Sequence, residues 1–234
     1  MKARLVAIAL SLLAFAESAP AEESVDLELV LAIDASGSVD PGEWALQMQG
    51  YAAAFRDPRV QEALSSGPNG RIGVAVVVWA DATVPKWESA WFVLATPADA
   101  ERFATYMAGL ERGAIGGTGI GAGIAAAIRK LDRNGLTAPR QVVDVSGDGR
   151  ETPAREFVVL IHWARQMAQA RGVTVNGLAI LNEEPDLAGW YRSHVIAGAG
   201  AFVLTAADYQ DFTRAIVAKL IREIEHMPRL SALP

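Results

Sequence analysis

The stretch that follows Arg71 constrains the fold most, because it runs to Trp79 without one polar side chain. Its residues, Ile-Gly-Val-Ala-Val-Val-Val-Trp, are apolar on both faces of an extended chain. A strand with two apolar faces lies inside a sheet that helices cover on both sides. The sequence therefore favours an α/β fold with this strand near the centre of the sheet.

The rest of the chain alternates between two kinds of pattern. Runs of strand-forming residues occur at 28–33, 141–146, 173–180 and 201–204, and helical patterns at about 40–56, 96–110, 120–131, 155–171, 187–195 and 207–225. This alternation predicts one α/β domain with a mostly parallel sheet. Residues 84–94 follow the central strand too closely for a crossover, so we expect them to pair antiparallel with it. Pro85 places that stretch at a sheet edge.

Local signals add detail to this picture. Asp40-Pro-Gly-Glu43 has an N-cap acid, a proline at the first helical position and a second acid three residues later, which predicts a helix start. Trp163 fits the apolar face of the helix predicted at 155–171 and is expected in the core. Asp144 interrupts a buried-looking strand, and we expect it to pair with a neighbouring polar group or with the backbone.

The first residues have the pattern of a secretory signal peptide. Lys2 and Arg4 precede the apolar run Leu5–Phe15, and Ala19-Pro-Ala21 fits a cleavage site. A membrane anchor would need about 20 apolar residues, which is more than this run provides. We therefore predict a signal peptide at residues 1–21, a folded domain at 22–227, a flexible tail at 228–234, and a periplasmic or secreted bacterial protein after cleavage near Ala21.

Charge and cysteine content narrow the choice of partners. The formal net charge is −6, and removal of Lys2, Arg4 and Glu17 with the signal peptide would make it one unit more negative. A nucleic-acid partner is not expected, because no basic field exists to neutralise phosphates. The chain has no cysteine, so a secreted form must be stabilised by its core. No later stretch is long enough to span a bilayer.

Oxygen-bearing side chains gather in three short motifs. Asp34, Ser36 and Ser38 lie in Ile-Asp-Ala-Ser-Gly-Ser-Val, Thr118 in Gly-Gly-Thr-Gly, and Asp148 in Val-Ser-Gly-Asp-Gly. The two acids each follow a predicted strand. Ligands of doubly wound sheets bind beyond the carboxyl ends of strands, where the strand order reverses. If the two strands are neighbours at that point, the two carboxylates meet.

Carboxylate and hydroxyl oxygens are hard ligands that favour Mg²⁺, Ca²⁺ or Mn²⁺ over zinc or copper. Because hydroxyls are neutral, they leave a bound cation more electrophilic than a cage of three carboxylates would. Simpler interpretations exist for each motif taken alone. Ser36 and Ser38 can cap the helix that starts near Asp40, and Asp148-Gly149 is also an ordinary turn signal.

Taken together, Asp34, Ser36, Ser38, Thr118 and Asp148 resemble the metal-ion-dependent adhesion site (MIDAS) of von Willebrand factor type A (vWA) domains. The chain also resembles a bacterial group of secreted, single-domain vWA proteins of unknown function. The resemblance implies a doubly wound, Rossmann-like domain whose mostly parallel six-stranded sheet has one antiparallel edge strand and helices on both faces. It further implies that the three hydroxyl residues bind the metal, that the two acids bind it directly or through water, and that an Asp or Glu of a partner protein completes the coordination.

The leading hypothesis is therefore a non-enzymatic binding module that uses Mg²⁺, or alternatively Ca²⁺ or Mn²⁺, to recognise an acidic group on a partner protein. One alternative is a metal-assisted hydrolase of phosphoesters or amides, in which Asp34 or Asp148 acts as a nucleophile or orients a water. Against it, neither motif contains a lysine or a histidine. A third possibility is a structural vWA scaffold whose site holds no metal.

Overall fold

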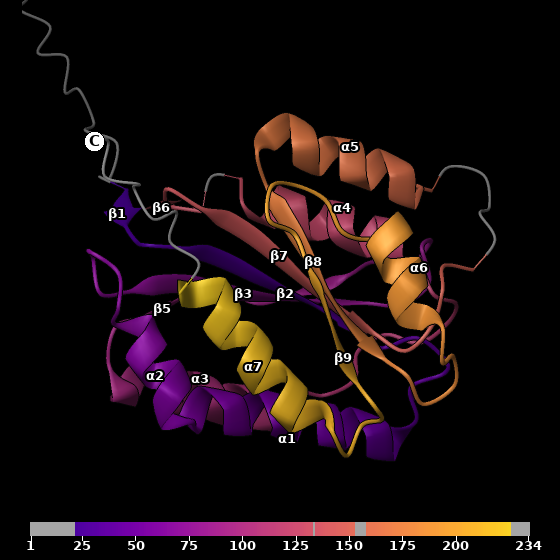
Figure 1. The fold of residues 1–234 in the computed structure, drawn as a ribbon, viewed down its shortest axis with the longest axis horizontal. Coiled ribbons are helices and arrows are strands. Elements are labelled where there is room, and N and C mark those ends of the chain that lie inside the picture. Colours follow the sequence, from indigo (N-terminus) through magenta and orange to yellow (C-terminus); the bar gives the residue numbers. More distant parts are fainter. Residues whose placement is uncertain (1–21, 133, 153–157, 226–234) are drawn as a thin grey trace, which may run out of the picture.

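The computed structural model describes residues 22–132, 134–152 and 158–225. The predicted signal peptide and tail lie outside these residues, and the predicted domain of residues 22–227 is described as far as residue 225. The main sheet contains a run of parallel strands in the spatial order β3 (Ile72–Trp79), β2 (Glu28–Asp34), β7 (Gln141–Gly147), β8 (Thr174–Ile180) and β9 (Val203–Ala206), in which β9 lies at one edge (Figure 1). The predicted α/β fold with a mostly parallel sheet is confirmed.

Strand order reverses between β2 and β7. From β2 the chain moves outward to β3, and it later returns to place β7 on the opposite side of β2. The two strands are parallel, and Ile33 lies opposite Ser146 in their register. The carboxyl ends of β2 and β7 are therefore neighbours, which is the arrangement that brings Asp34 and Asp148 together.

The antiparallel edge predicted at residues 84–94 is present, but it is divided into β4 (Trp87–Glu88) and β5 (Phe92–Leu94), both paired with β3. Ser89 follows β4, and its Oγ accepts a hydrogen bond from the main-chain N of Val76 at 2.8 Å and donates one to the carbonyl of Ala90 at 2.6 Å. A side chain thus replaces the main-chain acceptor for Val76 of β3, at the interruption between β4 and β5. Within the described residues the main sheet consequently has seven strands rather than the expected six.

Helices cover both faces of this sheet (Figure 1). One layer contains α1 (Pro41–Arg56), α2 (Pro58–Leu64), α3 (Pro97–Ala108) and α7 (Phe212–Glu225), and the other contains α4 (Ile120–Lys130), α5 (Ile161–Arg171) and α6 (Leu187–His194). A small second sheet pairs β1 (Glu23–Ser24) with β6 (Leu136–Thr137). None of the described helices is both long and apolar enough to cross a bilayer.

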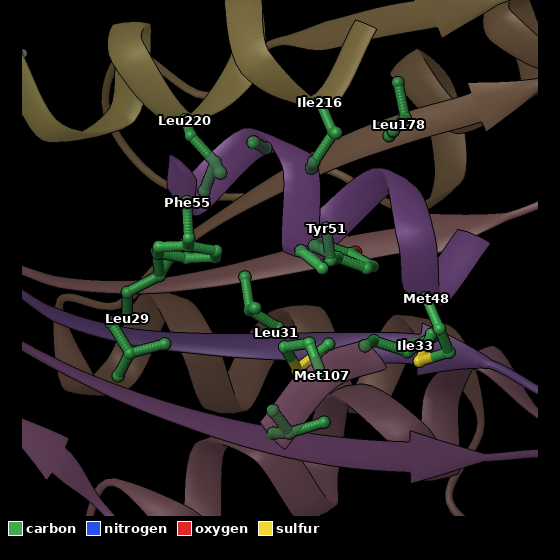
Figure 2. Close-up of a cluster of buried hydrophobic side chains, with 14 of the residues drawn as sticks. Leu29, Leu31, Ile33, Met48, Tyr51, Phe55, Met107, Leu178, Ile216 and Leu220 are labelled. Carbon is green, nitrogen blue, oxygen red and sulfur yellow. The ribbon is translucent and has the colours of Figure 1, made fainter. Parts of the chain in front are cut away.

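The core is divided by the sheet because successive side chains of a strand point to opposite faces. Leu29, Leu31 and Ile33 of β2 are fully buried against one layer, while Val30 and Ala32 are fully buried against the other. Figure 2 shows the first of these clusters, in which the β2 side chains meet residues of α1, α3 and α7. Each such aliphatic side chain stabilises the fold by about 1.5–3 kcal/mol.

Helix starts follow the local signals in α1 but not in α5. The predicted start of α1 is confirmed, because Asp40 Oδ1 accepts from Glu43 N at 2.8 Å and Glu43 Oε2 accepts from Asp40 N at 2.8 Å. The first residues of the helix predicted at 155–171 lie outside the described part of the chain. Within that part the prediction is wrong for residues 158–160, which are not helical, and α5 begins at Ile161. The expectation that Trp163 lies in the core is wrong: the residue is 54% exposed, whereas Ala164 and Ala168 form the buried face of α5.

One carboxylate serves the N-termini of both α4 and α5. The N-cap residues of these helices, Gly119 and Leu160, supply no side-chain hydrogen bond. Glu151 replaces them, because its Oε1 accepts from Gly121 N at 2.8 Å and its Oε2 accepts from Ile161 N at 3.3 Å. Free N–H groups at a helix start need such acceptors, and a negative charge there is also favoured by the helix dipole.

The predicted pairing of Asp144 is confirmed, and its partner is a lysine of α7. The Nζ of Lys219 lies 2.6 Å from Asp144 Oδ1 and 2.6 Å from Glu223 Oε1. Asn176 adds a hydrogen bond from its Nδ2 to Glu223 Oε1 at 2.9 Å. Burial, followed by the nearby charge of Asp144, raises the pKa of Glu223 to about 8. The cluster therefore sets one cation against two acids, an imbalance that favours the protonated form of Glu223.

Candidate metal centre

The Asp34 loop leaves the carboxyl end of β2 and is held in place mainly through its backbone. Asp34 Oδ1 accepts from Ser36 N at 2.7 Å, which turns the chain sharply after the strand. The amide of Gln47 in α1 donates to the Asp34 carbonyl at 3.2 Å. The guanidinium of Arg112 donates to the carbonyls of Ala35 at 3.0 Å and Ser36 at 2.5 Å. The loop is thus clamped from both sides.

A main-chain hydrogen bond joins the Thr118 loop to the Asp34 loop. Gly37 N donates to Gly116 O at 2.7 Å, and Gly116 has a φ of 137° that side chains rarely tolerate. At the other end of this loop, a Cβ on Gly119 would stand 2.5 Å from Ala82 N. The glycines around Thr118 therefore allow two close backbone approaches that larger residues would prevent.

Thr118 is brought next to the Asp148 loop. Its main-chain N donates to Thr152 Oγ1 at 3.0 Å, and its carbonyl accepts from Thr152 N at 2.9 Å. Its Oγ1 lies 3.9 Å from the point where a Cβ of Gly149 would stand. The three motifs that the sequence singled out thus converge beyond the ends of β2 and β7.

The hydroxyl groups are connected to Asp148. Ser38 Oγ donates to Asp148 Oδ1 at 2.7 Å, although the two residues are 110 positions apart in the chain. Ser36 Oγ lies 3.2 Å from Ser38 Oγ. A hydroxyl that binds a cation through its oxygen must direct its proton elsewhere. The carboxylate of Asp148 provides that acceptor for Ser38.

The two acids are buried and close enough to affect each other. Asp34, Ser36 and Asp148 have no solvent-exposed surface. Burial, followed by the neighbouring charge of Asp148, raises the pKa of Asp34 to about 7. Among the described residues, Asp34 Oδ2 has no hydrogen-bond partner. Two adjoining buried carboxylates with an unpaired oxygen fit a divalent cation, which would supply the missing positive charge.

The oxygens available to a cation at this site belong to hydroxyl groups as well as to carboxylates. No group of three or more His, Cys, Asp or Glu side chains in the described part of the chain is arranged to hold a metal. The oxygens that could hold a cation beyond the ends of β2 and β7 are those of the expected residues Ser36, Ser38 and Thr118 together with two carboxylates. Such an all-oxygen set suits Mg²⁺, Ca²⁺ or Mn²⁺ better than softer metals.

Two side chains that support the site carried no motif signal. The Tyr209 hydroxyl donates to Asp148 Oδ2 at 3.2 Å, from a segment that the sequence assigned to the last helix. That helix, α7, begins only at Phe212. Asp81 follows β3 and its Oδ2 accepts from Gly117 N at 3.3 Å, so it helps to hold the Thr118 loop. An acid close to the carboxyl end of a strand is a signal that could have identified Asp81, which is two residues beyond β3, because Asp34 stands at the end of β2.

A cavity of about 450 Å³ adjoins Thr118. Asp81, Thr83, Thr118, Glu151 and Thr152 contribute the polar part of its wall. The expected site is thus next to a recess rather than on a flat surface, which leaves room for a ligand from outside.

Comparisons with known proteins agree with this fold. The family model described as "Protein of unknown function (DUF1194)" matches residues 24–228. No curated protein matches the chain. The pilus adhesin SpaC from Lactobacillus rhamnosus GG is similar in structure, with a TM-score of 0.59 and 10% identity over 88% of this chain and 31% of that one.

Two further solved structures share the fold. Proximal thread matrix protein 1 from the mussel byssus, with a zinc-occupied MIDAS motif, has a TM-score of 0.53 and 16% identity over 88% of this chain and 49% of that one. The vWF domain of the type V pili tip protein Mfa5 from Porphyromonas gingivalis has a TM-score of 0.53 and 12% identity over 87% and 97%. The chain therefore spans about a third of SpaC and half of the mussel protein, but nearly all of the Mfa5 domain.

Proposed function

The chain belongs to the DUF1194 family and has the vWA fold, and from that premise we propose that it is a binding module that uses one divalent cation to recognise an acidic side chain of a partner protein. We propose Asp34, Ser36, Ser38, Thr118 and Asp148 as the metal site and Mg²⁺ as the native cation, with Ca²⁺ or Mn²⁺ as alternatives. The proposal includes secretion to the periplasm or beyond, after removal of the predicted signal peptide.

The observation that carries the proposal is the hydrogen bonding of the two acids, Asp148 and Asp34. Because Ser38 donates its proton to Asp148 Oδ1, the Ser36 hydroxyl at 3.2 Å is the donor toward Ser38, and one lone pair of the Ser38 oxygen is left for another group. At the same time Asp34 Oδ2 is buried without a partner among the described residues. The second feature is costly in a site built only for stability, because a buried carboxylate oxygen without a partner has lost its hydration and gained no hydrogen bond in exchange.

Within this proposal the residues have distinct tasks. Ser36, Ser38 and Thr118 would supply neutral oxygens, while Asp34 and Asp148 would supply negative charge directly or through water. When bound, the cation supplies a positive centre with a coordination position open to an outside carboxylate. The partner is expected to provide an Asp or Glu, because neutral hydroxyl ligands leave the cation more electrophilic than a cage of three carboxylates would, so that it attracts an incoming carboxylate.

The first experiment measures cation binding by calorimetric titration of the purified protein with Mg²⁺, Ca²⁺ and Mn²⁺. We expect one cation per chain and a loss of affinity in Ser38→Ala and Asp148→Asn. Matched controls are Ser65→Ala and Asp132→Asn, which change exposed residues whose side chains bond to the Gln61 carbonyl and to Arg171. Equal affinity in site variants and controls would disprove the assignment of the site.

The second experiment tests recognition with a synthetic array in which every Asp- or Glu-containing peptide has an Asn or Gln counterpart. We expect retention of acidic peptides in Mg²⁺, and no retention of their neutral counterparts or in chelator. Retention that persists in chelator, or that ignores the change from acid to amide, would rule out recognition through a metal-bound carboxylate.

A further inference from the structure

The carboxylate of Asp148 is held at both of its oxygens. Oδ1 accepts a hydrogen bond from Ser38 Oγ at 2.7 Å, and Oδ2 accepts one from the Tyr209 hydroxyl oxygen at 3.2 Å. Ser38 belongs to the Asp34 loop, whereas Tyr209 lies between β9 and α7 and belongs to no motif. The tyrosine is 4% exposed, so water does not compete effectively for its hydroxyl. The Asp34 loop and the segment between β9 and α7, which are far apart in the sequence, therefore both contact the Asp148 side chain.

The other acid of the pair is held differently. Asp34 Oδ1 accepts from the backbone N of Ser36, while its Oδ2 and the Tyr191 hydroxyl both lack partners within the described part of the chain. A Cβ on Gly147 would stand 2.8 Å from that Oδ2 and 2.6 Å from the Tyr191 hydroxyl. Both unpaired atoms therefore face the small space that this glycine leaves open. Asp34 keeps an oxygen without a donor, whereas Asp148 has its orientation set from two sides.

We propose that Tyr209 is a positioning residue of the metal site, which fixes Asp148 in the orientation that accepts the proton of Ser38. This inference rests on the cation binding proposed above. The path between the residues is short. Tyr209 donates to Asp148 Oδ2, Ser38 donates to Asp148 Oδ1, and the Ser38 oxygen keeps a lone pair for a cation. Without the tyrosine hydroxyl, Ser38 alone sets the terminal torsion of Asp148, which is then less restricted because such torsions have broad minima.

A purely structural role for Tyr209 is the rival explanation, since its ring packs in the core cluster around α1 and α7. Tyr51 offers a matched control for that role. It is also a buried tyrosine of this cluster, and its hydroxyl lies 3.1 Å from Ser146 Oγ, two residues before Asp148. Tyr51→Phe removes a buried hydroxyl from the same core without touching either carboxylate.

The test measures Mn²⁺ affinity of the full chain, wild type and variants, together with unfolding in chelator. For Tyr209→Phe we expect a dissociation constant about 10- to 100-fold higher, because side chains that orient metal ligands have effects of that size. For Tyr51→Phe we expect a change of less than about threefold, although its stability in chelator falls to a similar extent as that of Tyr209→Phe. Unchanged affinity in Tyr209→Phe would overturn the inference but not the proposed function. Absence of Mn²⁺, Ca²⁺ and Mg²⁺ binding by the wild type would overturn both.

A double-mutant cycle provides a second and independent readout. If Tyr209 acts through the proton of Ser38, then Tyr209→Phe has little further effect on Mn²⁺ affinity once Ser38 is already alanine. If the losses from Ser38→Ala and Tyr209→Phe simply multiply, the tyrosine does not act through Ser38 and the inference is wrong.

Discussion

The Nζ of Lys219 lies 2.6 Å from Oδ1 of Asp144, and neither side chain has any exposed surface. The pair fastens α7 to the centre of the sheet, because Asp144 lies in the middle of β7. Removing one partner of a buried ion pair lowers stability by more than the intact pair contributes, because the remaining charge stays buried without compensation.

We therefore expect Lys219→Met to lower the free energy of unfolding by about 3–5 kcal/mol. Chemical denaturation monitored by tryptophan fluorescence measures this loss. The double variant Lys219→Met, Asp144→Asn is the informative companion, because it removes the uncompensated charge and should recover part of the stability. A loss below about 1 kcal/mol in the single variant would show that the pair contributes little.

Stability should fall as pH rises toward the alkaline side. The pKa of Glu223 is raised from its ordinary value of 4.5 to about 8 by burial and by Asp144. Between these values the folded protein retains a proton that the unfolded chain has lost, so stability is highest near the lower pH and declines through the upper one. Glu223→Gln has no proton to lose and should show a shallower decline between about pH 5 and 8. Denaturation in chelator at several pH values measures both slopes, and equal slopes would contradict this account.

Gly147→Ala should damage the metal site rather than the fold as a whole. An added Cβ would stand 2.8 Å from Asp34 Oδ2 and 2.6 Å from the Tyr191 hydroxyl, so both must move. We expect a loss of about 1–3 kcal/mol in stability from overpacking and a clear loss of Mn²⁺ affinity. Gly189→Ala is the matched control: it meets no atom within 4 Å in the helix α6 and should stabilise the protein by about 0.5 kcal/mol. Normal Mn²⁺ binding by Gly147→Ala would count against Asp34 as part of the site.

Glu151→Ala should weaken two helix starts at once. Its carboxylate accepts from Gly121 N and Ile161 N, and loss of one helix cap usually costs about 0.5–2 kcal/mol. We expect a loss of about 1–3 kcal/mol, and about half of it in Glu151→Gln, which keeps one acceptor oxygen. Thermal or chemical unfolding measures the difference. Glu62→Ala, an exposed change on α2, should stay within about 0.5 kcal/mol of wild type.

Features encoded by neighbouring residues were predictable from the sequence. The apolar run after Arg71 indicated a strand buried on both faces, although β3 lies beside the edge strands β4 and β5 rather than at the centre of the sheet. Asp40 with Glu43 indicated the start of α1, because capping, like strand burial, depends on a few adjacent side chains. The position of Asp34 and Asp148 after strands indicated a shared edge of the sheet. Their proximity still depended on β2 and β7 being neighbours, which no local pattern determines.

Features made by contacts between distant segments were not predictable in the same way. The late start of α5 depends on Glu151, ten residues earlier, and the division of the edge strand depends on a serine hydroxyl replacing a main-chain group. Trp163 has an apolar side chain but lies on the outer side of α5. The contact between Tyr209 and Asp148 exists only once α7 has docked, so neither residue signals it alone.

The pairing of β2 with β7 has a consequence for the order of events during folding. The oxygens around Asp34 are synthesised long before those around Asp148, and they meet only when the middle of the sheet has closed over more than a hundred intervening residues. A cation held by both, as proposed above, would therefore bind only after β2 and β7 have paired, and we expect it to have no part in nucleating the fold. We expect the cation to slow the unfolding of the native protein and to leave the rate of folding unchanged.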